Sequence, residues 1–414
     1  MNSQQIKPEY HPFLSRPHHT IIVLSFPILL SLIAEPVTGL IDTGFVPQLG
    51  KTSLSALGVS TGVLSSVFWI FGFLGIGTQT EVSQTYGKGQ ISAAIKSVSL
   101  AITLGVIVSL FLILVLIPGA STISGLLGAE DAVLEQATHY IQIRLIGAPA
   151  VIITIVGFGA LRGIQDMKTP LWIALIINIT NVLLDYPFIF GWQFIPAMGV
   201  GGAALASVIS QWIGAGWMIW KINQKLGFTR DFNLSDGINL IKIGRDLFIR
   251  TGLLTLFMLI ETRVATQIGE EAGAAHQIIR QVWFFTALVL EAFATTAQSL
   301  IGYFYGAQHL DYAKQVATTT ILWSIGTGIV LMLGMFATTQ FVTNTFVPDD
   351  TVTVFLSAWI IASLSQPLNA IAFITDGIHW GTSDYSFLRN AMICATVIGV
   401  IGLLLIPVNH PEAF

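Results

Sequence analysis

Two long stretches of the chain repeat each other at a nearly constant spacing, and this repeat constrains the fold more than any other feature. An offset of 219 in the numbering takes Asp42 to Glu261 and Tyr86 to Tyr305, and the offset becomes 218 from Pro149 onward. Each copy carries an acid inside an apolar run. Internal duplication of apolar segments is typical of transporters that alternate between two open states.

The composition identifies lipid as the solvent of this chain. Only 10% of residues are charged, against roughly 25% in soluble domains, and 53% are hydrophobic, with a mean hydropathy of +0.76. A membrane-spanning helix needs about 20 apolar residues, and such runs recur along the whole sequence. The predicted spans are 20–46, 54–80, 92–117, 133–161, 169–190, 198–221, 246–268, 275–301, 313–341, 351–379 and 386–408.

The basic residues predict the orientation of these spans. With the N-terminus in the cytoplasm, 14 of the 18 basic residues fall in cytoplasmic segments or helix ends. The opposite loops hold acidic pairs such as Glu270-Glu271 and Asp349-Asp350. This bias follows the positive-inside rule. We therefore expect a multi-pass protein of the cell (inner) membrane with a cytoplasmic N-terminus.

The repeat also predicts the domain organisation. We expect an all-α polytopic membrane protein of two six-helix bundles in parallel orientation. The counterpart of the sixth span would begin near residue 417, beyond Phe414, so eleven helices are visible and a twelfth is missing. The predicted parts are a cytoplasmic tail (1–18), an N-lobe (19–222), a cytoplasmic linker (223–245) and a C-lobe (246–414).

Two acids of the first span are candidates for ion binding. An ionised acid at mid-membrane costs roughly 2.5–3.5 kcal/mol on insertion scales, and such residues usually have a function. Glu35 and Asp42 are two helical turns apart, so they share one face of a helix. Pro36 lies between them and removes a backbone hydrogen bond, which permits a kink.

A polar stripe on the fifth span supplies possible partners. Asn178, Asn181 and Asp185 recur at i, i+3 and i+7 on an otherwise apolar helix. A carboxylate in a medium of low dielectric readily takes up a proton, and oxygen ligands suit a hard cation such as Na⁺. The alternative is that these groups bond to one another and only hold helices together.

The second half has its own intramembrane acids, Glu261 and Asp376. They form a possible C-lobe site for the coupling ion or the substrate. Alternatively, they pair with Arg263 or Arg280 as structural salt bridges.

Other chemistries find little support in the sequence. There is no phosphate-binding loop of the Walker type and no metal-ligand spacing among the eight histidines. We expect no cofactor, no nucleic-acid partner and no enzymatic activity, since no nucleophile–base pair stands out. A flippase for lipid-linked oligosaccharides remains an alternative, although it would need basic residues in its cavity. A membrane-embedded enzyme is a further alternative, which the sequence supports less.

Four motifs in order make the chain resemble the multidrug and toxic compound extrusion (MATE) family, nearest its DinF-like branch. They are Ile41-Asp-Thr-Gly-Phe-Val46 with Leu49-Gly50, Leu161-Arg-Gly-Ile-Gln-Asp166 with Thr169-Pro170, Asn181-Val-Leu-Leu-Asp-Tyr186, and Gly199-Val-Gly-Gly-Ala-Ala-Leu-Ala206. The resemblance covers nearly the whole chain.

The resemblance implies a monomeric antiporter that exports organic, often cationic, small molecules in exchange for H⁺ or Na⁺. It implies two six-helix lobes around a cavity that opens alternately to each side of the membrane. In DinF-like members the cation site lies in the N-lobe and corresponds to Asp42, Asn181 and Asp185. In other branches, acids of the C-lobe serve, at the positions of Glu261 and Asp376.

Overall fold

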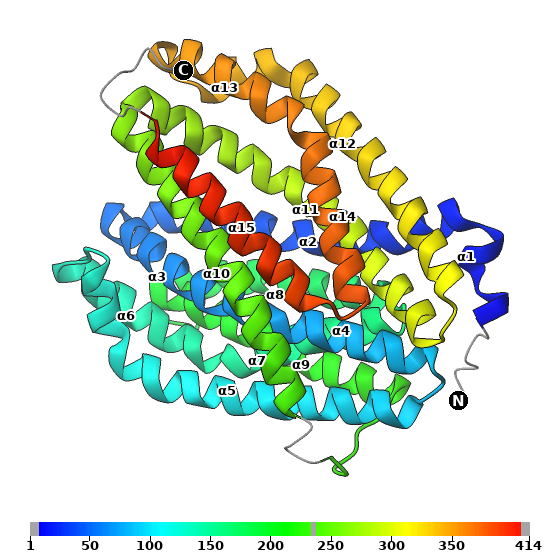
Figure 1. The fold of residues 1–414 in the computed structure, drawn as a ribbon. Coiled ribbons are helices and arrows are strands. Elements are labelled where there is room, and N and C mark those ends of the chain that lie inside the picture. Colours follow the sequence, from blue (N-terminus) through cyan, green and yellow to red (C-terminus); the bar gives the residue numbers. More distant parts are fainter. Residues whose placement is uncertain (1–7, 233–236, 407–414) are drawn as a thin grey trace. The chain divides into compact units, whose positions relative to one another are not determined.

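The computed structural model describes residues 8–232 and 237–406, except for a few side chains within helices (Figure 1). The part of the chain described is helical, without a β-strand. Its first helices are α1 (Pro12–Ser15), α2 (Pro17–Phe45), α3 (Lys51–Ile70), α4 (Gly72–Gly87), α5 (Ile91–Leu126), α6 (Asp131–Ile146), α7 (Ala148–Gly163), α8 (Lys168–Phe190) and α9 (Val200–Lys225). The later helices are α10 (Gly237–Ile268), α11 (Glu270–Gly306), α12 (Leu310–Phe346), α13 (Val352–Leu364), α14 (Gln366–Gly381) and α15 (Tyr385–Leu404).

These helices confirm the multi-pass membrane fold. Within the described ranges, eight helices are long and apolar enough to cross a membrane, and two bent helix pairs raise the number to ten. The bent pairs are α6 with α7, at 50°, and α13 with α14, at 46°. Helix α10 covers the seventh predicted span, so every predicted span coincides with a helix or a broken helix.

The bends lie at equivalent places in the two halves. Pro149 occupies the first turn of α7, and Pro367 occupies the first turn of α14. A proline is tolerated in the first turn, where its missing N–H would have no intrahelical partner, but it prevents the preceding helix from continuing unbroken. The sequence repeat that relates the two prolines therefore relates two breaks in the structure.

The loops after these broken helices are built alike. Asp166 accepts a hydrogen bond from the backbone N–H of Thr169 at 3.1 Å, and Asp384 accepts one from Phe387 at 3.2 Å. Each carboxylate thus satisfies an unpaired donor at a helix N-terminus. The residues just before the two acids, Gln165 and Ser383, both have a left-handed backbone, with φ of 64° and 65°. The duplication extends to the detail of these turns.

Small residues set the closest helix contacts at matching positions. A Cβ added to Gly159 would overlap the carbonyl oxygen of Gly75 on α4, and one added to Gly377 would overlap that of Ala294 on α11. Gly159 and Gly377 correspond to each other under the same repeat as the two prolines. Such residues let membrane helices approach backbone to backbone. They hold α4 against α7 in the first half and α11 against α14 in the second.

The described residues divide into two compact units. The first contains residues 30–232 and 237–242, and the second contains residues 8–29 and 243–406. The start of the chain thus groups with the second unit, whereas the tail and N-lobe boundaries expected from the sequence placed it elsewhere. Ser25 explains this in part, because its hydroxyl lies 2.8 Å from that of Thr296 on α11. The buried Phe13 ring contacts Phe304 of the same helix.

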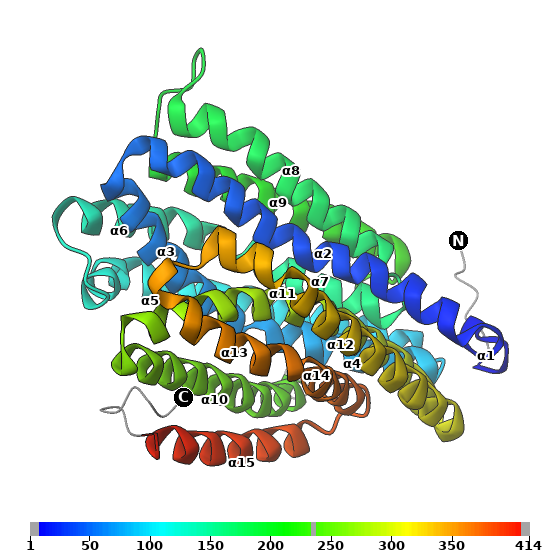
Figure 2. The same ribbon diagram turned by 90° about the horizontal axis from the view of Figure 1, so that it is seen from above.

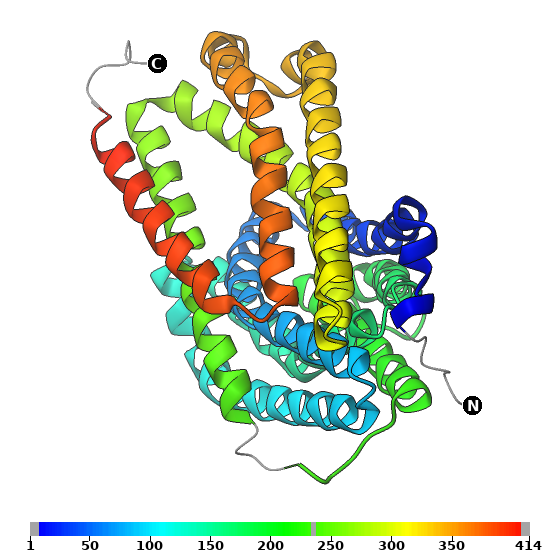
Figure 3. The ribbon, with the colours of Figure 1, turned by 45° about the vertical axis from the view of Figure 1, so that its right-hand side comes forward.

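The second unit contains two groups of helices. Helices α11 to α14 pack closely together, whereas α10 and α15 run side by side (Figures 1 and 3). Figure 2 shows α10 and α15 side by side from a perpendicular direction. A Cβ on Gly399 of α15 would meet the Phe257 ring of α10 at 2.5 Å, so the two helices touch there. Polar side chains link α10 to α11, α14 and α15.

Candidate functional site

Close packing of α8 against α9 positions the polar stripe of the first unit. A Cβ on Gly202 would overlap the carbonyl oxygen of Phe188, and one on Gly214 would overlap the side chain of Ile177. Two glycines about three turns apart on α9 therefore let the helices approach closely, against the backbone of α8 at Gly202 and against the Ile177 side chain at Gly214. Ser207 lies between them on α9 and reaches the stripe on α8.

Asn181, Asp185 and Ser207 form a buried polar cluster. The Asn181 Nδ2 amide donates to Asp185 Oδ1 at 3.4 Å and to Ser207 Oγ at 3.3 Å. The exposed fractions are 4% for Asn181, 0% for Asp185 and 8% for Ser207. Asn178, one turn earlier, is half-buried. The cluster presents carboxylate, amide and hydroxyl oxygens in an apolar helix pair, which suits a proton or a small hard cation.

Pro187 lies inside α8 just beyond this cluster. Its ring has no N–H, so the carbonyl of Leu183, one turn earlier, lacks its intrahelical partner. The helix nevertheless continues to Phe190. The proline thus weakens the helix beside Asp185 without ending it.

The other predicted members of this site are on α2. Helix α2 runs from Pro17 to Phe45 and continues through the position of Pro36. The side chains of Glu35 and Asp42 are outside the described part of the structure. Their contribution to the site stays a prediction from the sequence.

The acids of the second unit do not form one site. Asp376 on α14 forms an ion pair with Arg250 on α10, and the Arg250 guanidinium lies 5.7 Å from the centre of the Trp380 ring. Arg250 precedes Glu261 by three helical turns, or about 16 Å along a helix. Asp376 thus forms an ion pair, which was one of the two alternatives, but its partner is neither Arg263 nor Arg280. The side chain that reaches it comes from much earlier on α10.

Glu261 lies in a different cluster, between α10 and α11. The Thr262 hydroxyl is 3.1 Å from His276 Nε2, and both Glu261 and Arg280 interact electrostatically with His276. Arg263, the other predicted partner, is exposed. The sequence analysis missed His276, Arg250 and Ser207, since nothing in a single sequence shows which side chains face each other across helices.

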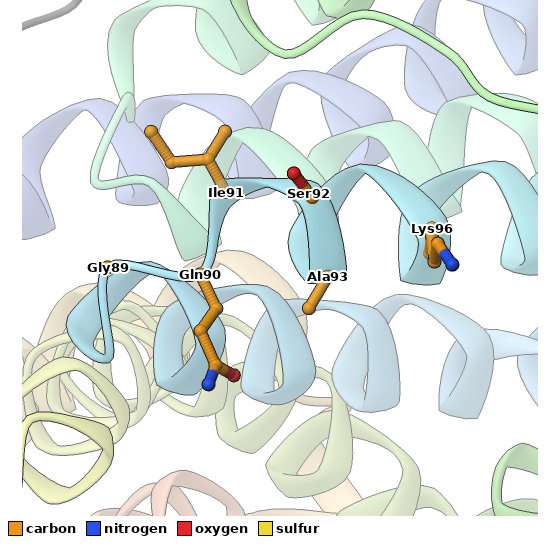
Figure 4. Close-up of a pocket in the computed structure, with 6 residues that line it drawn as sticks. All are labelled: Gly89, Gln90, Ile91, Ser92, Ala93 and Lys96. Atoms are coloured by element: carbon orange, nitrogen blue, oxygen red, sulfur yellow. The ribbon is translucent and has the colours of Figure 1, made fainter.

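One surface depression lies apart from these clusters. It is lined by Gly89, Gln90, Ile91, Ser92, Ala93 and Lys96, from the turn before α5 and the first turns of α5 (Figure 4). Lys96 pairs with Asp231 at 3.0 Å on the surface of the first unit. This depression contains no acid and is formed by a single segment, so it does not have the features of an ion or substrate site.

Among the residues described, no group of three or more histidine, cysteine, aspartate or glutamate side chains could hold a metal ion. A divalent ion usually requires several carboxylates or imidazoles. The side chain of Asp42, the other carboxylate predicted for this cluster, is outside the described part of the structure.

Comparisons with known proteins agree with this architecture. The MatE family matches residues 27–187 and 247–405, which are the two repeats. Protein DETOXIFICATION 44, chloroplastic, of Arabidopsis thaliana is 30% identical over 99% of this chain and 81% of its own length. DNA damage-inducible protein F of Escherichia coli is 25% identical over 95% of this chain and 87% of its own length.

Solved structures show the same fold. One, described as the outward-facing conformation of a multidrug resistance MATE family transporter of the MOP superfamily, has a TM-score of 0.83 at 21% identity and covers 92% of this chain and 86% of its own. Another, of MATE in complex with MaD3S, also has a TM-score of 0.83. The duplicated helices, the family match and these relatives together show that the chain is a DinF-like member of the MATE family of membrane transporters.

Proposed function

We propose that this protein is a cation-coupled antiporter that exports organic, often cationic, compounds, with Asp185 as the central residue of its ion site. The single observation that carries the proposal is the complete burial of Asp185 between α8 and α9, with Asn181 as its hydrogen-bonded partner. The family supplies the transport activity, and this cluster supplies a reason for ion dependence.

The free energy of a buried charge supports an ionic role. An ionised aspartate inside a membrane costs roughly 2.5–3.5 kcal/mol, and each hydrogen bond from a neutral group offsets only about 1 kcal/mol of this. A proton or Na⁺ bound at Asp185 lowers the remaining cost. The ion-free and ion-bound states of the first unit therefore differ in stability, which is what coupling requires.

Asn181 and Ser207 act as positioning residues in this scheme. Because one amide nitrogen carries two hydrogens, Asn181 donates to Asp185 and Ser207 at the same time. Its carbonyl oxygen is then available to a cation. Asp42 is the proposed second carboxylate, from the position predicted on α2.

The proposed cycle follows from these groups. A cation from outside binds between Asp185 and Asp42 and reduces their combined negative charge by one. This bends α2 near Pro36 and weakens the binding of the substrate, which leaves outward. The cation then escapes to the cytoplasm and the empty carboxylates favour substrate binding again. The cycle is proposed to take place in the cell membrane, with the N-terminus of the protein in the cytoplasm. The protein is proposed to act as a monomer.

The test is efflux of a fluorescent organic cation such as ethidium from vesicles that contain the protein. An imposed pH gradient and an imposed Na⁺ gradient are applied separately. We expect one of them to drive efflux, and Asp185→Asn to abolish it while the protein still inserts and folds. The matched control is Glu135→Gln, which removes an exposed carboxylate from α6 of the same unit. Efflux by Asp185→Asn equal to that of Glu135→Gln would refute the proposal.

A further inference from the structure

The second unit contains a histidine that contacts Thr262, the residue next to the repeat counterpart of Asp42. His276 lies in the second turn of α11, and Glu261, the residue that matches Asp42 in the second repeat, is two turns before the end of α10. The equivalent position to His276 in the first repeat is Leu57. The second acid therefore has a titratable neighbour that the first repeat does not provide at that position.

The hydrogen bonds of Thr262 fix which nitrogen of His276 carries the proton. The Thr262 hydroxyl donates to the carbonyl oxygen of Met258 at 2.8 Å. Its only hydrogen is used in that bond, so its oxygen accepts from His276 Nε2 at 3.1 Å. Nε2 is thus protonated in the neutral ring, and Nδ1 is the nitrogen that takes up a second proton.

The charges around His276 come from two helices. Glu261 on α10 favours the imidazolium, and Arg280, one turn further along α11, opposes it. Helices α12, α13 and α14 pack against α11. The outer half of α12 and the whole of α13 contain no titratable side chain. In α14, Asp376 is paired with Arg250, and His379 lies 3.6 Å from Asp384. Glu271, in the first turn of α11, and Asp350, in the short turn before α13, are exposed. The protonation of His276 therefore depends first on its burial and then on the charges of Glu261 and Arg280.

The depth of the cluster suits proton entry from outside. His276 is about 9 Å along the helix from the first residue of α11, at a rise of about 1.5 Å per residue. Under the orientation predicted by the basic residues, the first residue of α11 lies at the outer side of the membrane. Protonation changes the sum of charges on Glu261, His276 and Arg280 from zero to one positive charge. Helix α10, which has few close contacts with α11 to α14, is the element that this charge would move.

We propose that His276, held by Thr262 beside Glu261, is a second proton-binding site in the C-terminal unit of the transporter. The proposal rests on the antiport function proposed above and adds one proton to each transport cycle. Histidine is suited to this role because it changes charge between about pH 5 and 8.

The first test is direct and does not depend on transport. The full-length protein, labelled with ¹³Cε1-histidine and placed in nanodiscs, is titrated by NMR, and the His276 resonance is assigned by its loss in His276→Gln. We expect that resonance to titrate between about pH 5 and 8, with a midpoint at lower pH in Glu261→Gln and an unchanged midpoint in Glu271→Gln. A resonance that does not titrate, or a midpoint that is insensitive to Glu261→Gln, overturns the proposal.

The second test measures the number of protons used. Gln retains an N–H donor for Thr262 but cannot take up a proton, so His276→Gln preserves the packing and removes the site. At a gradient of one pH unit, the loss of one proton per cycle lowers the limiting accumulation of ethidium about tenfold. His19→Gln, at an exposed position of the same unit, is the control. Equal accumulation by the two variants overturns the proposal, whereas absence of exchange in the wild-type protein would refute only the antiport function.

Discussion

The ion pair between Arg250 and Asp376 gives the sharpest prediction about the stability of the second unit. The side chains are 14% and 18% exposed, so both charges are largely removed from water. Two contacting charges attract by about 4 kcal/mol at an effective dielectric constant of about 20. Removing one partner of such a pair usually costs roughly 3–5 kcal/mol, because the other charge is left uncompensated. We therefore expect Arg250→Met and Asp376→Leu each to destabilise the protein by about that amount.

The double variant is expected to behave differently. Replacing both charges with apolar groups of similar size removes the uncompensated charge, so Arg250→Met/Asp376→Leu should be more stable than either single variant by about 3 kcal/mol. Equilibrium unfolding of the purified protein in detergent measures these free energies. The control pair is Lys96 and Asp231, which are 46% and 88% exposed. Breaking that surface pair should cost at most about 1 kcal/mol.

The pH dependence of the two single variants separates the causes of their instability. In Arg250→Met the carboxyl group of Asp376 has lost its partner and can avoid being a buried charge by taking up a proton. For a carboxyl group with an ordinary pKa near 3.9, protonation at pH 7 costs about 4 kcal/mol. The loss in free energy of unfolding of Arg250→Met relative to the wild type should therefore shrink by about 1.4 kcal/mol for each pH unit by which the pH is lowered. In Asp376→Leu the stranded guanidinium cannot lose its proton, so no such recovery is expected. A double variant that loses the sum of both single losses would refute this account.

Two further predictions concern the contact between α8 and α9. Gly202→Ala should reduce the yield of folded protein sharply, since its Cβ overlaps the carbonyl oxygen of Phe188, whereas Gly216→Ala on the same helix meets nothing within 4 Å and should be neutral or slightly stabilising. Size-exclusion profiles of the two variants test this, and equal profiles would contradict it. Ser207→Ala should raise the concentration of driving cation needed for half-maximal efflux roughly fivefold, the equivalent of about 1 kcal/mol for a lost hydrogen bond. Its control is Ser210→Ala, whose hydroxyl bonds only to the backbone of its own helix, and equal values for the two variants would contradict the role of Ser207.

The helices could be predicted well from the sequence because their periodicity and the repeat are local and visible in one chain. The spacing of Asn178, Asn181 and Asp185 correctly put them on one helix. The breaks at Pro149 and Pro367 were not predicted, since the spans 133–161 and 351–379 ran through both prolines. The burial of Asp185 followed from the apolar residues around it. These features depend on properties of single segments, which a sequence contains.

Contacts between segments were harder to predict. Arg250 and Asp376 are separated by 126 positions, and the choice of Arg263 or Arg280 rested only on their position inside apolar runs. Which arginine reaches an acid depends on the rotation of each helix about its axis. That rotation is set by packing, for example by the contact of Gly399 with Phe257. The same limit explains why Ser207 and His276 were not found, although both lie next to residues that the sequence singled out.

The central claim is that a cation bound at Asp185 exchanges for substrate, and countertransport measures this most directly. Proteoliposomes with an ethidium gradient, but no imposed pH or Na⁺ gradient, are monitored with a pH-sensitive dye and with ²²Na⁺. The account predicts that movement of ethidium in one direction drives H⁺ or Na⁺ in the other in the wild-type protein and in Glu135→Gln, and that neither ion moves in Asp185→Asn. Ethidium movement without movement of either ion, or unchanged exchange in Asp185→Asn, would contradict it.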